Sequence, residues 1–273
     1  MNVFKIYPSL IILLIGFLAV SCGTNGTQQE EVAETEDNST PAYRADMPES
    51  MKNGIESIGG IEKWNSYNRQ EYDLKSSWSE DHQLIDLKSR KVKLSSDKYT
   101  VGFDGEQVWV TPSKDSIGNA RFYSSLFFYF LNIPYVFNDN GVIYEDRGRK
   151  TLDGKEYDVV SVSFESGIGD ADKDEYIAYF NPETGVMEWL LYTVTYHEGK
   201  RRDQYNALNY VDWTDVGGVQ LPGRLLGYKF QGDSLGDQRY EASFENIIMS
   251  VESPDQSLFE IPEGAEIDSL KTN

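Results

Sequence analysis

The sequence predicts a mainly β domain, built as an antiparallel sheet, with one short helix before the sheet and one apolar interruption within it. The first indication is a period-two alternation of apolar and polar residues in about ten or eleven segments, which is typical of antiparallel strands with one solvated face. The second is the content of 18 Tyr, 13 Phe and 5 Trp, since aromatic residues favour strands. The 273 residues suffice for one large domain with attachments.

Residues 1–21 have the layout of an export signal. Lys5 precedes an apolar run from Leu10 to Val20, and small residues lead to Cys22. This run is too short and wrongly flanked for a stable membrane-spanning helix. The ending LAVSC resembles a bacterial lipoprotein signal, which implies cleavage before the cysteine and attachment of a diacylglyceryl group and an acyl chain such as palmitate. An ordinary cleaved signal and an uncleaved anchor are the alternatives.

Cys22 is the only cysteine, so no disulfide is expected and the thiol is best explained as a lipid attachment point. Residues 22–47 carry few large apolar side chains and cannot offset the entropy of ordering, which predicts a flexible acidic tether. Gly23 stands where an aspartate would mark inner-membrane retention. We therefore expect an outer-membrane anchor with the domain in the periplasm. The cell surface is the alternative location.

The folded domain is expected over residues 48–270. Its first element is a short helix with Pro48 in the first turn and Gly59-Gly60 as its stop. Apolar residues recur along this helix and into a second turn at helical spacing: Met51, Ile55, Ile58, Ile61 and Trp64. Strand-like segments follow, and Asp-Gly, Gly-Gly and NPETG turns separate several of them: residues 70–79, 98–103, 107–112, 149–152, 156–164, 174–180, 186–199, 202–213, 219–230 and 238–247.

The stretch FYSSLFFYFLNIPYVF, residues 122–137, interrupts the strands. A helix over residues 122–131 would be about 15 Å long, half of what a bilayer core requires, so it is not a transmembrane span. Phe127 to Leu131 are consecutive and apolar or aromatic, so such a helix must be covered on nearly every side. Three interpretations stay open: a fully buried core helix, a lid over an apolar cavity, or an element that touches the membrane.

The charge excludes some partners. Acids outnumber bases by 45 to 25, which gives a formal net charge of −20. A nucleic acid requires Lys and Arg to displace its counterions, so nucleic-acid binding is not expected. The same charge opposes adsorption of the folded surface on anionic lipid headgroups. Contact with a membrane is expected through the Cys22 anchor.

A resemblance to a known family rests on several segments taken in order. They are the lipoprotein signal, the helix ending in GGIEKW, the series of strands, FDGEQVWVTP, the FNPETG turn and the terminal SLFEIPEGAEI. Over roughly residues 50–268 the chain resembles the LolA/LolB/LppX-like outer-membrane lipoprotein-sorting proteins, and within them an uncharacterised branch from Bacteroidota. The resemblance implies an incomplete antiparallel β-barrel of about eleven strands, with helices plugging its concave face.

The resemblance also assigns structural roles to particular segments of this chain. Residues 122–137 would contain the plug helix, and Asp104, Gly105 and Trp109 would form a DG-x-x-x-W hairpin. LolA itself is a soluble shuttle without an acylated cysteine, so Cys22 favours an anchored receptor or carrier like LolB or LppX. No arginine of this chain matches the one that latches the LolA lid.

The predicted function is binding or transfer of an apolar ligand, a lipid or the acyl chain of a lipoprotein, by a membrane-anchored monomer. The alternative is a non-catalytic structural or protein-binding envelope lipoprotein with a permanently packed core. No cofactor is expected. The expected ligand-binding residues are large apolar side chains: Phe122, Phe127, Phe128, Phe130, Leu131, Tyr135, Phe137, Trp78, Trp109 and Trp189.

Signatures of catalysis and of metal binding are weak, so the chain is predicted not to be an enzyme. HExxH and CxxC are missing from the sequence. His82 and His197 are interpreted as solvated loop residues. The segment DADKD places Asp170, Asp172 and Asp174 at the spacing of a calcium loop, but the glycine and the bidentate glutamate of such a loop are missing. We expect an acidic hairpin tip there and no metal site. A pair of carboxylates acting on envelope glycans is a third, weaker possibility.

Overall fold

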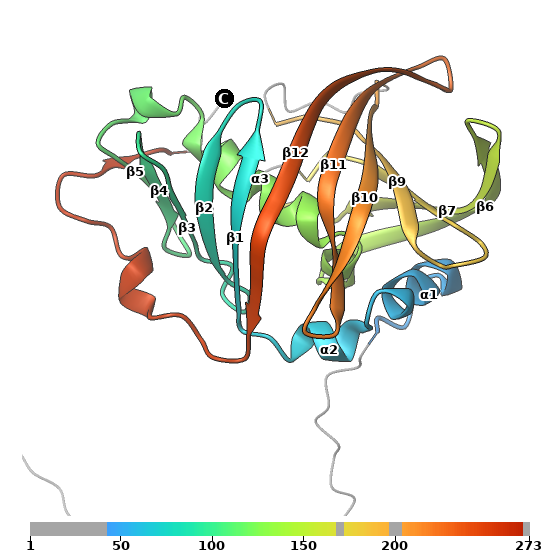
Figure 1. The fold of residues 1–273 in the computed structure, drawn as a ribbon, viewed down its shortest axis with the longest axis horizontal. Coiled ribbons are helices and arrows are strands. Elements are labelled where there is room, and N and C mark those ends of the chain that lie inside the picture. The colour runs from blue at the N-terminus through green and yellow to red at the C-terminus, as the bar shows by residue number, and fades with distance from the viewer. Residues whose placement is uncertain (1–42, 168–171, 197–203, 270–273) are drawn as a thin grey trace, which may run out of the picture. The chain divides into compact units, whose positions relative to one another are not determined.

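The computed structural model describes residues 43–167, 172–196 and 204–269, and the compact unit that contains them runs from Thr40 to Asn273. Thirteen strands form one sheet in the described part of the chain (Figure 1). They are β1 (Arg69–Ser76), β2 (Glu80–Asp86), β3 (Val92–Ser95), β4 (Thr100–Phe103), β5 (Val108–Thr111), β6 (Val142–Leu152), β7 (Lys155–Phe164), β8 (Tyr176–Phe180), β9 (Met187–Tyr192), β10 (Asn206–Val216), β11 (Val219–Gln231), β12 (Ser234–Ser250) and β13 (Glu266–Ile267).

The sheet is antiparallel and open. Its order is β13-β5-β4-β3-β2-β1-β12-β11-β10-β9-β8-β7-β6, so most neighbours in space are also neighbours in sequence. The pairing of β1 with β12 joins the first and the last long strand, with Arg69 opposite Ser250 and Leu74 opposite Phe244. The edge strands β13 and β6 do not pair with each other among the described residues. The predicted fold class, an incomplete antiparallel barrel, is confirmed.

The turns follow from the sequence. Asp104-Gly105 joins β4 to β5, and Gly217-Gly218 joins β10 to β11. Asp153 and Gly154 both have positive φ, 48° and 77°, as the tight two-residue turn between β6 and β7 requires. Each of these three dipeptides therefore marks a hairpin, which sets the register of the strands beside it.

Two short helices lie below the strands in Figure 1. Helix α1 (Glu49–Ser57) ends before Gly59 and Gly60, whose φ angles of 118° and 81° suit glycine because a side chain would clash there. Helix α2 (Ile61–Asn65) follows directly. Their apolar faces are buried as the sequence predicts, with Ile55 and Ile61 at most 1 % exposed.

Helix α3 (Ala120–Asn132) runs across one face of the sheet (Figure 1). It contacts β3, β4, β5 and β11, so both halves of the sheet touch it. Three 3₁₀ turns complete the described elements: η1 (Lys114–Ser116), η2 (Tyr135–Asn138), which follows α3, and η3 (Gln256–Phe259). None of the helices in the described ranges is long and apolar enough to cross a membrane.

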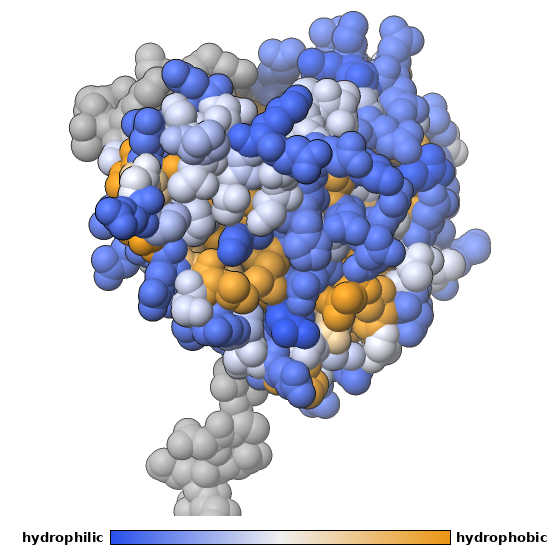
Figure 2. Space-filling model, turned by 60° about the vertical axis from the view of Figure 1, so that its left-hand side comes forward, coloured by the Kyte–Doolittle hydropathy of each residue, from blue (hydrophilic) through white to orange (hydrophobic). Residues whose placement is uncertain are grey.

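Apolar side chains gather on both faces of the sheet. The larger cluster lies on the face that carries α3 and includes Phe127, Phe130 and Leu131. A smaller cluster, which includes Leu152, Tyr157 and Leu191, is separate from the first. Figure 2 shows one outer face of the molecule, where hydrophilic residues predominate and hydrophobic patches are small.

The structure differs from the sequence-based expectation in the number and length of strands. The predicted segment 149–152 is only the end of the longer strand β6 (Val142–Leu152), because residues 142–148 are three consecutive apolar residues followed by exposed Glu, Asp, Arg and Gly, a pattern without alternation. The predicted strand 186–199 is shorter, since β9 ends at Tyr192. The two-residue strand β13 pairs with β5, which no periodicity can reveal in so short a segment.

Candidate functional site

Helix α3 begins at a capped N-terminus. The Asn119 side chain accepts a hydrogen bond from the backbone N–H of Phe122 at 3.1 Å, the usual role of asparagine before a helix. The Asp268 carboxylate accepts from the backbone N–H of Arg121 at 2.9 Å. A negative charge at this helix end also interacts favourably with the helix dipole. The C-terminal segment of the chain thus helps to position the start of α3.

The other end of α3 is tied to the centre of the sheet. Asn132 and Gln70 of β1 exchange two side-chain hydrogen bonds, at 2.8 and 2.9 Å, and both residues are fully buried. The Tyr210 hydroxyl of β10 donates to the backbone carbonyl of Phe130 at 2.9 Å. Because a buried amide left without a partner costs about 1–3 kcal/mol, these contacts hold the end of the helix against strands of both halves.

A buried carboxylate fixes the first half of α3. Asp81 of β2 is 5 % exposed and accepts hydrogen bonds from the hydroxyls of Tyr123 at 2.8 Å and Tyr99 at 2.7 Å. The Gln83 amide donates to its second oxygen at 2.8 Å. Burial, and then the nearby Asp81 charge, raise the pKa of the Tyr123 hydroxyl, so the tyrosine stays a neutral donor. Asp81 is therefore a structural anchor for α3.

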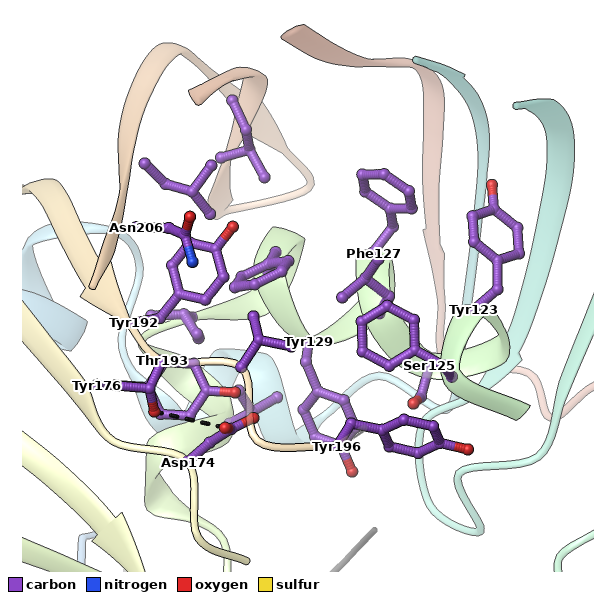
Figure 3. Close-up of a pocket in the computed structure, with 18 of the residues that line it drawn as sticks. Tyr123, Ser125, Phe127, Tyr129, Asp174, Tyr176, Tyr192, Thr193, Tyr196 and Asn206 are labelled. Carbon is purple, nitrogen blue, oxygen red and sulfur yellow. Dashed lines mark hydrogen bonds between the residues drawn. The ribbon is translucent and has the colours of Figure 1, made fainter. Parts of the chain in front are cut away.

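A cavity of about 590 Å³ lies between α3 and the sheet (Figure 3). Its volume is typical of small-molecule sites, which range from about 300 to 1,000 Å³. Most of its wall is apolar or aromatic, and several elements contribute. The side chains from α3 and η2 include Phe122, Leu126, Phe127, Tyr129, Phe130, Val136 and Phe137, and those from the sheet include Val142, Phe164, Tyr176, Tyr192, Leu208, Leu225, Tyr240 and Ala242.

Trp78 stands at the edge of this cavity. It belongs to the turn between β1 and β2 and is 59 % exposed, although it is one of the largest apolar side chains. Its ring lies 4.6 Å from the ring of Tyr240 and 6.2 Å from that of Phe127. An exposed tryptophan packed on two cavity-lining rings leaves an apolar surface at the edge of the cavity.

A buried carboxylate, that of Asp174, forms another part of the cavity wall. Asp174, just before β8, is 7 % exposed. Its Oδ1 accepts from the backbone N–H of Thr195 at 2.7 Å and from the Thr193 hydroxyl at 3.4 Å (Figure 3). Burial raises the pKa of the Asp174 carboxyl, and the hydrogen bonds from the two threonines oppose this shift only in part.

Three other charged side chains line the cavity. Asp139 accepts two hydrogen bonds from the Arg90 guanidinium, both at 2.8 Å, so its charge is compensated. Arg239 is exposed and donates to the Asn206 side chain at 3.4 Å. Arg121 lies at the start of α3. Among the described residues that line the cavity, Asp174 is the carboxylate that is buried and forms no ion pair with a described Lys or Arg.

Half of the predicted ligand-binding residues line this cavity. They come from the β1–β2 turn, from α3 and from η2: Trp78, Phe122, Phe127, Phe130 and Phe137. These side chains are distant in sequence or on successive turns of α3, and the fold brings them to one space. The other five do not line it: Phe128, Leu131, Tyr135, Trp109 and Trp189.

Each of these five packs elsewhere. The Phe128 ring lies 5.2 Å from the Arg90 guanidinium, and Leu131 is completely buried in the core. Tyr135 stacks on Trp64 with ring centroids 4.8 Å apart.

The two remaining tryptophans pack against other parts of the fold and do not line the cavity. Trp109 is 2 % exposed, covers Gly102, and donates from Nε1 to the Phe259 carbonyl at 3.0 Å. Trp189 packs on Tyr228 at 5.3 Å, with the smaller cluster on the other side of the sheet. Cys22, the predicted lipid attachment site, lies outside the described residues.

The sequence-based view of two polar segments was wrong. Asp174, expected at an acidic hairpin tip, is buried in the cavity wall, because Thr193 and Thr195 across the strand pair supply its hydrogen bonds. His82, expected in a loop, lies in β2, where Asp73 Oδ1 is 2.8 Å from its Nδ1. His197 and Asp170 lie outside the described residues. In the ranges with described side chains, no cluster of His, Cys, Asp and Glu could hold a metal ion.

Sequence reasoning also missed the tyrosines of the cavity. Tyr176 and Tyr192 lie on β8 and β9 and point at the space beside α3 (Figure 3). Each lies in a predicted strand, but alternation alone does not tell which strand face meets the apolar segment. The signal that could have located them is their place on the same strand faces as Ala178 and Leu190, which are fully buried.

Comparisons with known proteins place this architecture beside several solved structures. Residues 90–213 match a family of unknown function, DUF6503, and no curated protein matches the chain. A DUF1329 family protein from Desulfovibrio piger is similar over 77 % of this chain and 95 % of its own, with 10 % identity and a TM-score of 0.47. A LolA superfamily protein from Nitrosomonas europaea covers 78 % and 96 %, with 8 % identity and a TM-score of 0.41.

The lipoprotein LppX from Mycobacterium tuberculosis is similar over 72 % of this chain and 94 % of its own, with 9 % identity and a TM-score of 0.30. At such identities and scores these similarities say nothing about ligand or activity. The open sheet and the helix across its face, as the structure itself shows them, agree with the LolA-like fold that the sequence predicts.

Proposed function

We propose that this chain is an exported protein, anchored through a lipid on Cys22, that binds the aliphatic chain of a lipid or of an acylated protein in the cavity beside α3. The observation that carries the proposal is the cavity itself, about 590 Å³ in volume and walled mainly by aromatic and aliphatic side chains. Each methylene that leaves water for such a wall contributes about 0.8 kcal/mol. An aliphatic chain is the common natural ligand with this chemistry.

The position of α3 supports binding without displacement of the helix. Both ends of α3 are held by buried hydrogen bonds, from Tyr123 to Asp81 and between Gln70 and Asn132. The cavity exists with these contacts in place. In this proposal α3 therefore forms a wall of the site and stays docked while the ligand enters past Trp78.

The second candidate function is a structural or protein-binding envelope lipoprotein whose interior never takes a ligand. The buried anchors of α3 favour it, since they rigidify the domain as a purely structural part requires. A cavity of this size counts against it, because empty space forfeits packing interactions that natural cores normally make. The proposal includes no catalytic step and requires no metal or cofactor.

A binding measurement with a matched pair of variants tests the proposal. Ser125 of α3 lines the cavity (Figure 3), so Ser125→Trp is expected to fill part of the space with an indole, whereas Ser125→Ala leaves the space open. The chain that starts at residue 23 is purified, stripped of lipid and titrated with pyrene-labelled hexadecanol and pyrene-labelled hexadecanoic acid, and pyrene fluorescence reports binding.

We expect saturable binding of at least one probe by the wild type and by Ser125→Ala, and a loss of tenfold or more in affinity for Ser125→Trp. Near-ultraviolet circular dichroism and the urea midpoint verify that the Ser125→Trp variant folds. A folded wild type that binds neither probe would contradict the proposal and favour the structural function. Equal binding by Ser125→Trp would place the ligand outside this cavity.

A further inference from the structure

Asp174 is a buried charge with neutral partners only. Its hydrogen bonds come from the Thr195 backbone N–H at 2.7 Å and the Thr193 hydroxyl at 3.4 Å. Within the described ranges no Lys or Arg forms an ion pair with this carboxylate. Asp139, which also lines the cavity but is half-exposed, pairs with Arg90 at 2.8 Å. Asp81 is buried with neutral partners too, but it accepts hydrogen bonds from Tyr99, Tyr123 and Gln83 and does not line the cavity.

Burial of the Asp174 carboxylate without a cation lowers the stability of the folded protein. An ionised carboxylate taken out of water without a cation loses several kcal/mol of solvation. An asparagine at this position would accept the same hydrogen bond from Thr195 without carrying the charge. A perturbed acid in the wall of a cavity is instead typical of a functional group.

The cavity has a polar part and an apolar part (Figure 3). Asp174, Thr193 and Tyr176 gather on one side of it, and Phe127 and Tyr123 of α3 lie on the other. The Tyr176 hydroxyl adds a second polar group beside the carboxylate, since the Asp174 charge acts on it. A molecule that fills the whole space must therefore be amphipathic, with its polar end toward Asp174.

We propose that the ligand carries a hydroxyl or amine head group that donates a hydrogen bond to the Asp174 carboxylate, while its aliphatic chain lies along Phe127 and Phe130 of α3. This inference rests on the proposed binding of an aliphatic ligand and specifies its chemical class. The carboxylate accepts hydrogen bonds and repels anions, so a fatty alcohol, a glyceride with free hydroxyls or an aliphatic amine fits. A fatty acid or a phosphate-terminated lipid brings a second negative charge and does not.

Photo-crosslinking of the full chain in isolated envelope membranes tests the inference. Three hexadecyl probes carry the same photoactivatable diazirine in the chain and end in an alcohol, an amine or a carboxylate. Peptide mapping by mass spectrometry measures how much of each probe attaches to α3. The comparison uses wild type, Asp174→Asn and a control, Asp97→Asn, which removes an exposed acid from the β3–β4 turn, away from the cavity.

The control separates the specific effect from general attraction of cations to an acidic protein, since both variants lose one negative charge. We expect the wild type and Asp97→Asn to prefer the alcohol and amine probes over the carboxylate probe. In Asp174→Asn this preference should fall by about tenfold, the typical effect of losing one hydrogen bond to a charged group. Differences in partitioning of the probes into the membrane cancel when variants are compared.

Two contrary results are distinguishable. If no probe attaches to α3 whatever its head group, the proposed function itself fails. If all three probes attach to α3 equally, or if Asp174→Asn keeps the wild-type preference, an aliphatic ligand binds but Asp174 does not select its head group. A reversed preference for the carboxylate probe in the wild type would also overturn the inference.

Discussion

The side-chain amides of Gln70 and Asn132 pair with each other through two hydrogen bonds, at 2.9 and 2.8 Å, in the fully buried space between β1 and the end of α3. Neither residue belongs to an apolar pattern, and they are separated by 62 positions in the chain. The pair fixes where the helix ends over the sheet. Because the cavity lies between α3 and the sheet, the pair also helps to set the distance between the two walls of the cavity.

Breaking this pair should destabilise the domain. Asn132→Leu leaves the Gln70 amide buried without a partner and removes the side-chain bond to the Phe128 carbonyl, so we expect a loss of about 2–4 kcal/mol in the free energy of unfolding. The double variant with Gln70→Leu should recover part of this loss, because both polar groups are then gone. Urea denaturation of the four proteins of this cycle measures the coupling. Additive effects of the two single changes would show that the amides act independently.

The Asp174 carboxyl should make stability depend on pH in an unusual direction. Burial raises its pKa in the folded state, so between its unfolded and folded pKa values the folded protein binds more protons. Stability from this group is complete below the unfolded pKa of about 3.9 and is lost as pH rises through the folded value. We expect Asp174→Asn without ligand to be more stable than the wild type at pH 7, with a difference that shrinks toward pH 4. Thermal unfolding across this range checks it. A less stable variant at neutral pH would mean that the charge stabilises the fold.

Lipidation at Cys22 is tested in cells. Incorporation of a clickable palmitate analogue should label the wild-type chain and not Cys22→Ala, because no other cysteine is present. The substituted chain should also leave the outer-membrane fraction, since the aliphatic anchor supplies the membrane affinity. Fractionation with known inner- and outer-membrane markers provides the control. Retention of Cys22→Ala in the membrane would favour an uncleaved anchor in place of a lipid.

Strands and turns could be predicted from the sequence because their signals lie in residues that are close together in the chain. The alternation in β1 and β12 and the Asp-Gly turns between β4 and β5 and between β6 and β7 require only neighbours in sequence. The helical spacing that ends at Gly59 is of the same kind. The mainly antiparallel fold with a helix in the apolar interruption follows from such signals, and the structure confirms it.

The sequence could only partly predict which residues line the cavity. Phe127 and Phe130 line the cavity while Phe128 and Leu131 do not, although all four belong to one apolar run. Which side of a uniformly apolar helix meets open space depends on how the helix is rotated. Long-range contacts set that rotation here, from Tyr210 to Phe130 and from Gln70 to Asn132.

The sequence by itself determined most of the strands, the hairpins, the apolar helix and the excess of acidic residues, since each depends on residues close together in the chain or on composition. Only the tertiary structure decided that Asp174 is buried in the cavity wall with no ion pair to a described Lys or Arg, and that Trp78 stands at the edge of the cavity. The reason is that burial of a polar group depends on what packs across from it. For Asp174 the partners are Thr193 and Thr195, about twenty residues further along the chain, brought opposite it by the pairing of β8 with β9.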